Sequence, residues 1–481
     1  MNKKVVIIGA GLGGLQCAYI LAKNGIDVTV LEKEHIVGGC LQSFKRGNTI
    51  FDTGFHYVGG LREGESLYPL FRYFNLLNLP WQQLNEECFD EVVIGNKSFS
   101  LAVGHERFVE TLAEVFPHEK EGLKRYVSFL KEVGDHIYDA FQPRETTDFY
   151  SDSLFARSAY EFLSDTIHDP LLRKVLSGSS LKLELNQETL PLYVFAQINN
   201  SFIQSAWRIR GGGQQIADHL VQDVIRMGGR VRTRANVTRI DTKDGLATGV
   251  WIDNKERIET SDVICDIHPK VVMNLLADSP SLRRIYRRRI DSLDETYGMF
   301  TANIRLKANA MSYLNRNIYV HREDSDLWNP DTSIVNSAMV SFYPEQPALD
   351  ILTPLRWSQV ASWAEHRDAE YEAFKEKKTE ECLQLVEKRL PALRDAIDQV
   401  YTSTPLTYQR FTNTYEGSAY GIRKDWRSPI TTVLAPKTPI DNVLLTGQNL
   451  NLHGVLGVSM TSVITASQII GMDTLNAQIV K

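Results

Sequence analysis

A strand, a glycine turn, a helix and a second strand can be read in order in residues 3–34, and this order constrains the fold more than any other feature. The segment reads "KKVVIIGAGLGGLQCAYILAKNGIDVTVLEKE", with G-x-G-x-x-G at Gly9, Gly11 and Gly14 and an acid, Glu32, closing the second apolar run. This order is typical of a βαβ unit that binds a dinucleotide. It predicts an α/β chain built on a Rossmann-like sheet.

Each glycine of this motif has its own physical task. Gly9 permits the tight turn out of the strand, Gly11 lets the backbone approach a pyrophosphate, and Gly14 lets the helix pack closely on the sheet. The helix N-terminus offers free N–H groups and a positive dipole end to the phosphates. Glu32 can accept hydrogen bonds from both ribose hydroxyls and would repel a 2′-phosphate, so the motif predicts an adenosine diphosphate with a free ribose.

A glycine pair, Gly38 and Gly39, follows Glu32 at six and seven residues. It frees the backbone to pass close to an extended cofactor, which suits FAD lying across the domain. The alternative is a glycine turn that arose by chance. The ordered strand, helix, second strand and terminal acid argue against it.

Length and charge narrow the function further. A chain of 481 residues is long enough for two or three domains, and a net charge of −6 without a block of like charge argues against a nucleic-acid partner. The five cysteines are scattered, odd in number and without a C-x-x-C pair. This pattern fits a reducing compartment and predicts no metal site.

Three apolar segments resemble targeting or membrane-contacting sequences. The first 22 residues have the lysines and apolar run of a secretory signal, but the glycine spacing favours the βαβ unit. "VLGVSMTSVITASQII" near the C-terminus suits a buried helix better than a membrane span. We therefore expect a cytoplasmic protein without signal peptide or transmembrane helix. "SLYPLFRYFNLLNLPW" at 66–81 is read either as a buried helix or as a lip that contacts a membrane peripherally.

Residues 50–60, "IFDTGFHYVGG", hold His56 and Tyr57 between two glycine-bearing turns. Asp52, Thr53 and Gly54 are ordinary turn residues, and a lone histidine is more often hydrogen-bonded filler than a catalyst. Either side chain is also chemically suited to hold or donate a proton. The stretch is therefore open to a structural and a functional interpretation.

Taken together, "LEKEHIVGGCLQSFKRGNTIFDTGFHYVGG", "RGGGQQIADHL" at 210–220, "STPLTYQRFTNTYEGSAYG" at 403–421 and "NVLLTGQNLNLHGVLGVSMTSVITASQII" at 442–470 resemble the FAD-dependent polyene oxidoreductases. This family includes phytoene desaturases, carotenoid isomerases and retinol saturases, and the last are the most similar. The resemblance runs nearly end to end. Most of the wider flavoprotein group has an acid after the C-terminal glycine, whereas Gln448 looks like the saturase branch.

The resemblance implies the FAD-binding residues and the two domains. The implied cofactor-binding residues are Gly9, Ala10, Gly11, Leu12, Gly13, Gly14, Glu32, Lys33, Gly38, Gly39, His56, Val237, Gly447, Gln448, Gly454, Gly457 and Val458. Residues 1–62, 205–277 and 430–481 would form a discontinuous FAD-binding domain of the glutathione-reductase or amine-oxidase type. Residues 63–204 and 278–429 would form an inserted α+β substrate-binding domain with a helical lid.

Residues outside the glycine motifs have their own periodicity. Helices are expected over 105–116 and 121–141, strands over 298–306 and 332–343, and a charged, solvent-facing helix over 362–390. One alternating strand is expected over 230–240, another strand over 261–269, and a third at "DNVLLTG". The last precedes a helix that opens with Gly454 and Gly457, which fits a second phosphate-compatible helix start or a tightly packed core helix.

The chemistry implied is hydride delivery from flavin N5 to one carbon of an isolated double bond, with protonation of the other by His56 or Tyr57. The expected substrate is a long apolar polyene, retinoid- or carotenoid-like. A desaturase or a cis–trans isomerase is the alternative within the family; an amine oxidase and a flavin-free prenyl-lipid carrier are weaker rivals. No second dinucleotide motif follows residue 39, so electrons would enter at the flavin itself, from NAD(P)H bound transiently without a dedicated domain or from another carrier. The oligomeric state is not predicted.

Overall fold

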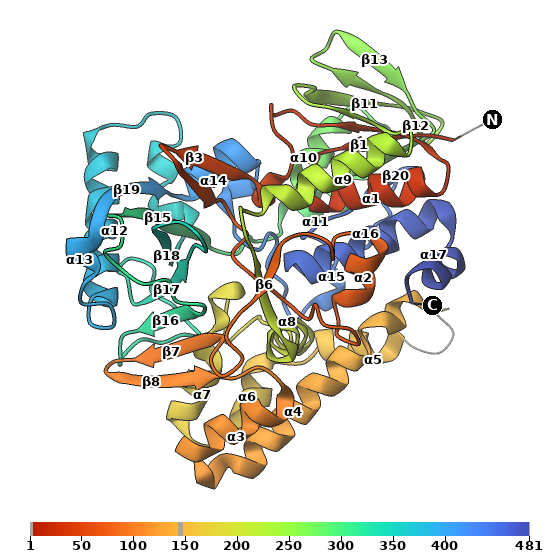
Figure 1. Ribbon diagram of the computed structural model, residues 1–481. Coiled ribbons are helices and arrows are strands. Elements are labelled where there is room, and N and C mark those ends of the chain that lie inside the picture. Colours follow the sequence, from red (N-terminus) through yellow and green to blue (C-terminus); the bar gives the residue numbers. More distant parts are fainter. Residues whose placement is uncertain (1–2, 143–147, 481) are drawn as a thin grey trace.

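Alternate residues of the first strand face two different layers. In the computed structural model, which describes residues 3–142 and 148–480 (Figure 1), β1 (Lys4–Ile8) directs Val5 and Ile7 into one apolar core and Val6 and Ile8 into another. Successive side chains of a strand point to opposite faces, and both faces of this strand are covered. This double burial explains why the apolar run is continuous rather than alternating.

Strand β1 lies at the centre of a five-stranded parallel sheet with the order β10-β2-β1-β14-β20. Ile8 lies opposite both Leu31 and Cys265, so the strands end at one edge. The predicted βαβ unit is present, since helix α1 (Leu12–Lys23) joins the first two strands. The other strands are β2 (Asp27–Leu31), β10 (Arg230–Arg232), β14 (Asp262–Cys265) and β20 (Val443–Leu445).

Two layers cover the parallel sheet. On one face, α1 shares its core with α9 (Gln214–Arg226), α16 (Gly454–Ile470) and the following α17 (Met472–Ile479). The other face packs on β11 (Val237–Lys243), β12 (Leu246–Ile252), β13 (Glu256–Glu259), α10 (Pro269–Leu275) and α11 (Arg284–Asp291). The strands predicted at 261–269 and "DNVLLTG" are β14 and β20, and the helix expected after Gly454 is α16.

The expectation of one alternating strand over 230–240 was wrong. The chain turns at Arg234, whose φ is +55°, and the amide of Ala235 donates to the carbonyl of Glu32 at 2.8 Å. Residues before the turn add β10 to the edge of the parallel sheet, and residues after it start β11 in the antiparallel sheet. One segment thus serves two layers, which periodicity alone does not reveal.

A second, seven-stranded sheet has the order β19-β15-β18-β17-β16-β7-β8. Side chains of neighbouring residues again point to opposite faces of the sheet. Phe300, Val340 and Ile351 pack in a core with α12 (Ala369–Val386), whereas Met299, Met339 and Leu352 line a cavity. Its strands are β7 (Asp90–Ile94), β8 (Lys97–Leu101), β15 (Gly298–Leu306), β16 (Asn317–His321), β17 (Ser337–Phe342), β18 (Ala348–Leu355) and β19 (Ile397–Ser403). The strands predicted around 298–306 and 332–343 are β15 and β17.

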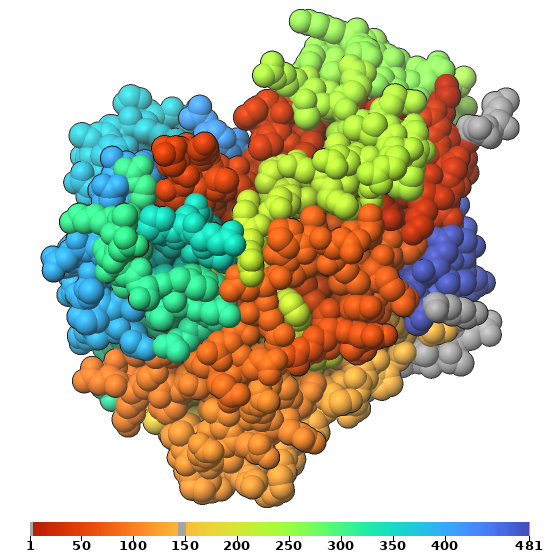
Figure 2. Space-filling model, viewed as in Figure 1, coloured from red at the N-terminus to blue at the C-terminus, as the bar shows by residue number. Residues whose placement is uncertain are grey.

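Helices from residues 105–204 lie on the side away from the β11–β13 sheet in Figure 1, and the orange surface at the lower end of Figure 2 belongs to the first of them. They are α3 (His105–Val115), α4 (Lys120–Asp135), α5 (Asp148–Phe155), α6 (Ala159–Thr166), α7 (Pro170–Gly178) and α8 (Leu192–Gln204). The helices expected over 105–116 and 121–141 correspond to α3 and α4, with a 3-10 turn finishing the second. Three shorter helices are α13 (Leu393–Ala396), α14 (Pro405–Thr412) and α15 (Pro429–Thr432).

Two small sheets and one short helix complete the strands and α-helices of the described residues. Strands β3 (Ser43–Arg46) and β4 (Thr49–Asp52) pair, as do β5 (Val58–Gly59), β9 (Ala206–Ile209) and β6 (Trp81–Gln83). Helix α2 (Tyr68–Tyr73) lies within 66–81, and Leu67, Leu70, Phe71 and Phe74 there are at most 1% exposed. The membrane-lip alternative for 66–81 was therefore wrong, and the buried helix is what forms.

The charged helix expected over 362–390 is α12, but its charges do not all face solvent. The side chain of Lys378 is only 2% exposed, and its Nζ donates to the carbonyl of Ser333 at 2.6 Å. Across the described residues, no helix is both long and apolar enough to cross a bilayer. The predicted domain boundaries stay a prediction; Ile290 of α11 packs with the layer around the parallel sheet although it follows residue 277.

Candidate functional site

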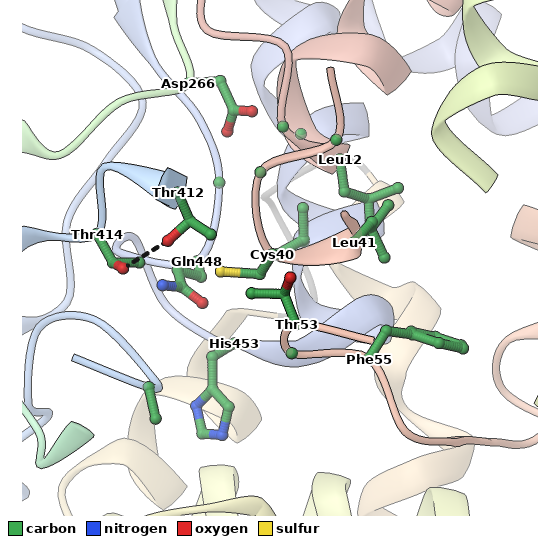
Figure 3. A pocket seen from close by; sticks show the side chains of 18 of the residues that line it. Leu12, Cys40, Leu41, Thr53, Phe55, Asp266, Thr412, Thr414, Gln448 and His453 are labelled. Carbon is green, nitrogen blue, oxygen red and sulfur yellow. Dashed lines mark hydrogen bonds between the residues drawn. The ribbon is translucent and has the colours of Figure 1, made fainter. Parts of the chain in front are cut away.

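A cavity of about 680 Å³ lies between the carboxyl edge of the parallel sheet and the inner face of the seven-stranded sheet. Figure 3 looks into it, with Asp266 at one end of the view and His453 at the other. Loops that follow parallel strands meet at this edge, which is where open α/β sheets bind ligands. The cavity therefore joins the dinucleotide motif to the second sheet.

The N-terminal glycines surround the cavity's sheet end. Gly9 turns with φ +97°, and a Cβ on Gly14 would lie 2.2 Å from the carbonyl oxygen of Gly9, so this helix can approach its strand only with glycine there. Gly11 and Gly13 line the cavity, as does the pair Gly38 and Gly39. A ligand can thus come close to bare backbone on two sides.

Glu32 is nearly buried at 9% exposure, and both of its oxygens are held by backbone amides. Oε2 accepts from the amide of Ala10 at 2.9 Å, and Oε1 accepts from the amide of Glu34 at 2.8 Å. Each carboxylate oxygen has more than one lone pair, so both can still accept from hydroxyls of a ligand. The acid is fixed in position at the end of β2.

The C-terminal turn brings a second glycine-bearing loop to the same cavity. Gly447, two residues after the end of β20, has φ +93°, and Gln448, Gly454 and Val458 line the cavity wall. Helix α16 begins at Gly454, so its free N-terminal amides lie at the wall.

Most of the predicted cofactor-binding residues line the cavity. Those that do are Gly9, Gly11, Leu12, Gly13, Glu32, Lys33, Gly38, Gly39, His56, Val237, Gly447, Gln448, Gly454 and Val458, together with the predicted catalytic Tyr57. Ala10, Gly14 and Gly457 do not. Ala10 anchors Glu32, Gly14 packs on Gly9, and a Cβ on Gly457 would lie 2.3 Å from the carbonyl oxygen of Leu452. These three therefore support the wall from behind.

His56 lines the cavity as a neutral imidazole. Burial, with a smaller contribution from the nearby Arg208 guanidinium, lowers the pKa of His56 to about 4. Its Nδ1 lies 3.9 Å from Oδ2 of Asp350, and its buried Nε2 has no hydrogen-bond partner within the described chain. Near neutral pH this side chain can orient or accept, but it carries no proton to give as an imidazolium.

The neighbour of His56 in the chain, Tyr57, belongs to a buried polar network. Its hydroxyl donates to Oδ2 of Asp90 at 2.9 Å and lies 2.6 Å from the hydroxyl of Tyr319, which must then be the donor to Tyr57. The Nζ of Lys182 lies 3.4 Å from the same Asp90 oxygen and 4.4 Å from the ring centroid of Phe202. The network thus pairs one buried carboxyl with one buried amine beside the cavity.

Several cavity residues were missed by the sequence reasoning. Asp266 directly follows β14, so its place at the carboxyl edge of a parallel strand was a usable signal. Tyr408, Thr412 and Tyr420 lie in residues 403–421, where the family resemblance assigns no site residue. His453 precedes the glycine that opens α16. Their positions depend on chain packing that no local motif encodes.

The residues present fit a flavin dinucleotide. Bare backbone lines the sheet end at two glycine turns, a fixed carboxylate lies at the end of β2, and an apolar wall lies beyond them. Among the residues that the structure describes, no group of three or more histidine, cysteine, aspartate or glutamate side chains is arranged to hold a metal ion.

Comparisons with known proteins give the same assignment. The family model described as flavin containing amine oxidoreductase matches residues 12–470. An all-trans-retinol 13,14-reductase of Danio rerio is 28% identical, covering 97% of this chain and 85% of that protein. A chloroplastic prolycopene isomerase 2 of an Oncidium hybrid cultivar is 23% identical, covering 84% and 73%.

Solved structures resemble the fold over nearly the full chain. A putrescine oxidase bound to putrescine has a TM-score of 0.66 at 17% identity, covering 98% of this chain and 99% of the other. An oxidoreductase of Methanosarcina mazei has a TM-score of 0.62 at 17% identity, covering 95% and 98%. The predicted fold class, a Rossmann-like sheet with an inserted second part, is thereby confirmed.

Proposed function

Because this chain belongs to the flavin-containing amine oxidoreductase family, we propose that it is an FAD-dependent oxidoreductase acting on carbon–carbon double bonds of a long apolar polyene, and that it acts as a saturase. The family accounts for FAD and for oxidoreductase chemistry. The observation that carries the substrate class is the similarity, over 97% of the chain, to proteins named all-trans-retinol 13,14-reductase.

FAD, when bound, supplies hydride transfer at flavin N5. In the proposed arrangement Glu32 accepts from the ribose hydroxyls, the bare backbone of Gly11 and Gly13 faces the diphosphate, and Gly447 with the start of α16 borders the flavin side. Support comes from the cavity, which all of these residues line. The proposed FAD-binding domain combines residues 1–62, 205–277 and 430–481.

The apolar end of the cavity suits a polyene. Ile198 and Phe202 of α8 face it from the helical part, and Met299, Met339 and Leu352 face it from the second sheet. Methionine side chains adapt to irregular apolar ligands. We propose that these residues hold the substrate chain and keep water from the reacting carbon.

Saturation also requires a proton at the second carbon. His56 is neutral, so we assign it to positioning the cofactor or substrate. The Tyr57 hydroxyl is the better proton donor of the two: its O–H would turn from Asp90 to the substrate, and Lys182 would replace the proton through Asp90. Burial, with the nearby Asp90, raises the pKa of Tyr57 well above its ordinary value, so donation must be driven by charge that develops on the substrate carbon.

The direction of hydride flow is part of the proposal. NAD(P)H is the proposed electron donor, binding transiently at the flavin. Similarity to proteins named prolycopene isomerase supports isomerisation as the second candidate, and desaturation would run the same hydride step in reverse.

We propose that the enzyme works in the cytoplasm and contacts, peripherally, the membrane that dissolves its substrate. Ile285 on α11 is 77% exposed and Ile430 on α15 is 88% exposed. Arg289 donates to the carbonyl of Ile430 at 2.6 Å, so these two helices are neighbours. Exposed apolar side chains beside arginines are typical of interfacial contact. Unchanged vesicle binding after Ile285→Ser and Ile430→Ser would contradict this contact.

The function is tested anaerobically with purified protein. NADPH or NADH should reduce the flavin, a retinoid or carotenoid should then reoxidise it, and the product should gain the mass of two hydrogens. Oxidised flavin that bleaches with polyene alone would identify a desaturase. Product of unchanged mass would identify an isomerase, and a protein that never binds flavin would contradict the proposal.

His56→Phe tests the turn between the two glycines. The variant should keep FAD, since backbone groups and Glu32 provide the proposed contacts, and should lose turnover because the substrate or flavin is no longer oriented. Flavin content is read from the visible spectrum, and turnover from product mass. Wild-type turnover in this variant would remove His56 from the mechanism.

A further inference from the structure

One carboxyl lies where two glycine turns meet, and the proposed chemistry does not use it. Asp266 follows the last residue of β14, and its amide donates to the carbonyl of Ile8 at 2.8 Å. On the other side, the amide of Thr446 donates to the carbonyl of Cys265 at 3.0 Å. Strand register therefore places Asp266 between the turn after β1 and the turn after β20.

Its side chain occupies the space that the glycines leave. Oδ2 lies 2.6 Å from the position of a Cβ on Gly11, and Oδ1 lies 2.7 Å and 2.5 Å from those on Gly13 and Gly447. Asp266 is partly exposed to the cavity that these glycines line. The acid thus lies in the cradle that suits a diphosphate.

No cation balances this carboxyl within the described residues. Glu32 is the other carboxylate of the cradle, and Cys17, Cys40 and Cys265 are the ionisable groups near it. Burial raises the pKa of each of these three thiols, so they are neutral there. His268, two residues along, has its Nε2 3.0 Å from Oε1 of Glu295 instead.

The surroundings already favour the neutral acid before any ligand binds. Burial is the largest cause, and the charge of Glu32 adds to it; together they raise the pKa of Asp266 to about 7, although the amides of Gly14 and Gly11 act in the opposite direction. A dianionic diphosphate in the same cradle would disfavour the carboxylate further. A protonated carboxyl, in contrast, can donate a hydrogen bond to a phosphoryl oxygen.

We propose that Asp266 binds the diphosphate of FAD as a neutral carboxylic acid, so that FAD binding takes up one proton and the affinity for FAD falls as the pH rises. The proton comes from solvent, no bond in FAD changes, and the acid's O–H donates to the diphosphate. This inference rests on the proposed FAD site but is independent of the substrate and of the direction of hydride flow.

The test measures FAD binding to the cofactor-free protein between pH 6 and pH 9, by quenching of flavin fluorescence. With a pKa of Asp266 near 7, single-proton linkage makes the dissociation constant rise toward tenfold per pH unit above that value, about a hundredfold over the range. Proton uptake, read with an indicator dye in weak buffer, should approach one per FAD at pH 8 and fall to nearly none at pH 6.

Two variants separate the candidate acids. Asp266→Asn keeps the shape and a donor N–H while removing the charge, so its FAD affinity should be independent of pH and should exceed that of the wild type at pH 9. Glu32→Gln is the matched control: it should bind FAD more weakly at every pH and keep the limiting slope and the uptake of one proton at pH 8. The rise in its dissociation constant should begin at a lower pH, because the charge of Glu32 helps to raise the pKa of Asp266.

Each outcome decides the inference. A pH-independent dissociation constant in the wild type, or an unchanged slope in Asp266→Asn, overturns it, and the proton count in the wild type decides even if the variant does not fold. Wild-type protein that binds no FAD at any pH refutes the cofactor assignment itself. Tight binding with no linked proton refutes only the role of Asp266.

Discussion

Two glycines of the same motif should respond to alanine in different ways. A Cβ on Gly14 would lie 2.2 Å from the carbonyl oxygen of Gly9 and 3.0 Å from Cβ of Asp266. No side-chain rotation relieves a contact with backbone, so α1 must move away from β1. Overpacking costs about 1–3 kcal/mol and sometimes more, and the helix propensity of alanine returns about 1 kcal/mol. Because the contact is with a backbone oxygen that cannot move aside, the upper end of the overpacking range applies, and Gly14→Ala should lose about 2 kcal/mol net.

Gly11→Ala should spare the fold and impair the cofactor. Its Cβ meets only the side chain of Asp266, with Oδ2 at 2.6 Å and Cγ at 3.6 Å, and this side chain can rotate. The stability loss should stay below about 1 kcal/mol, the lower end of overpacking. Adding Asp266→Ala should recover that loss. FAD affinity should still fall, because the methyl group fills the cradle.

The assay compares apparent melting temperatures of the cofactor-free proteins and then titrates each with FAD. Gly14→Ala is expected to melt clearly below both the wild type and Gly11→Ala, whereas Gly11→Ala is expected to melt near the wild type and to bind FAD poorly. A wild-type melting temperature for Gly14→Ala would refute the packing argument. Wild-type FAD affinity for Gly11→Ala would refute the cradle.

Three further predictions concern buried polar groups. Tyr57→Phe leaves Asp90 without one donor and should cost about 1–3 kcal/mol in a denaturant titration while FAD stays bound; an unchanged midpoint would contradict the network. Burial lowers the pKa of His321 to about 4, so between about pH 6.5 and pH 4 only the unfolded chain binds that proton. Relative to His321→Gln, the wild type should therefore lose about 2 kcal/mol of unfolding free energy between pH 7 and pH 5. A difference in unfolding free energy between the two proteins that stays constant with pH would refute this. Arg423→Met removes the bidentate partner of buried Glu184 and should lower the melting temperature, at a cost of up to about 3 kcal/mol. Arg356 is the more exposed partner of Glu184, so Arg356→Met should lower the melting temperature less. Equal decreases in melting temperature would argue against the bidentate pair as the stronger contact.

How much of the site could be predicted depends on how local its determinants are. The turn at Gly9, the packing at Gly14 and the acid at Glu32 follow from one contiguous βαβ unit, where spacing fixes which atoms meet. The partners of Tyr57 could not be predicted, because Asp90 and Tyr319 lie on strands of another sheet, 33 and 262 residues away in sequence.

The sequence by itself determined the βαβ unit, the turn at its first glycine and the fixed acid, because all three lie in one contiguous segment of the chain. Only the tertiary structure decided that 230–240 is two strands, that most apolar side chains of 66–81 are buried and that the imidazole of His56 is neutral. It alone also brought the carboxyl of Asp266 between Gly11 and Gly447. The reason is physical: burial and charge at one point are summed over every segment that packs there, and those segments are hundreds of residues apart along the chain.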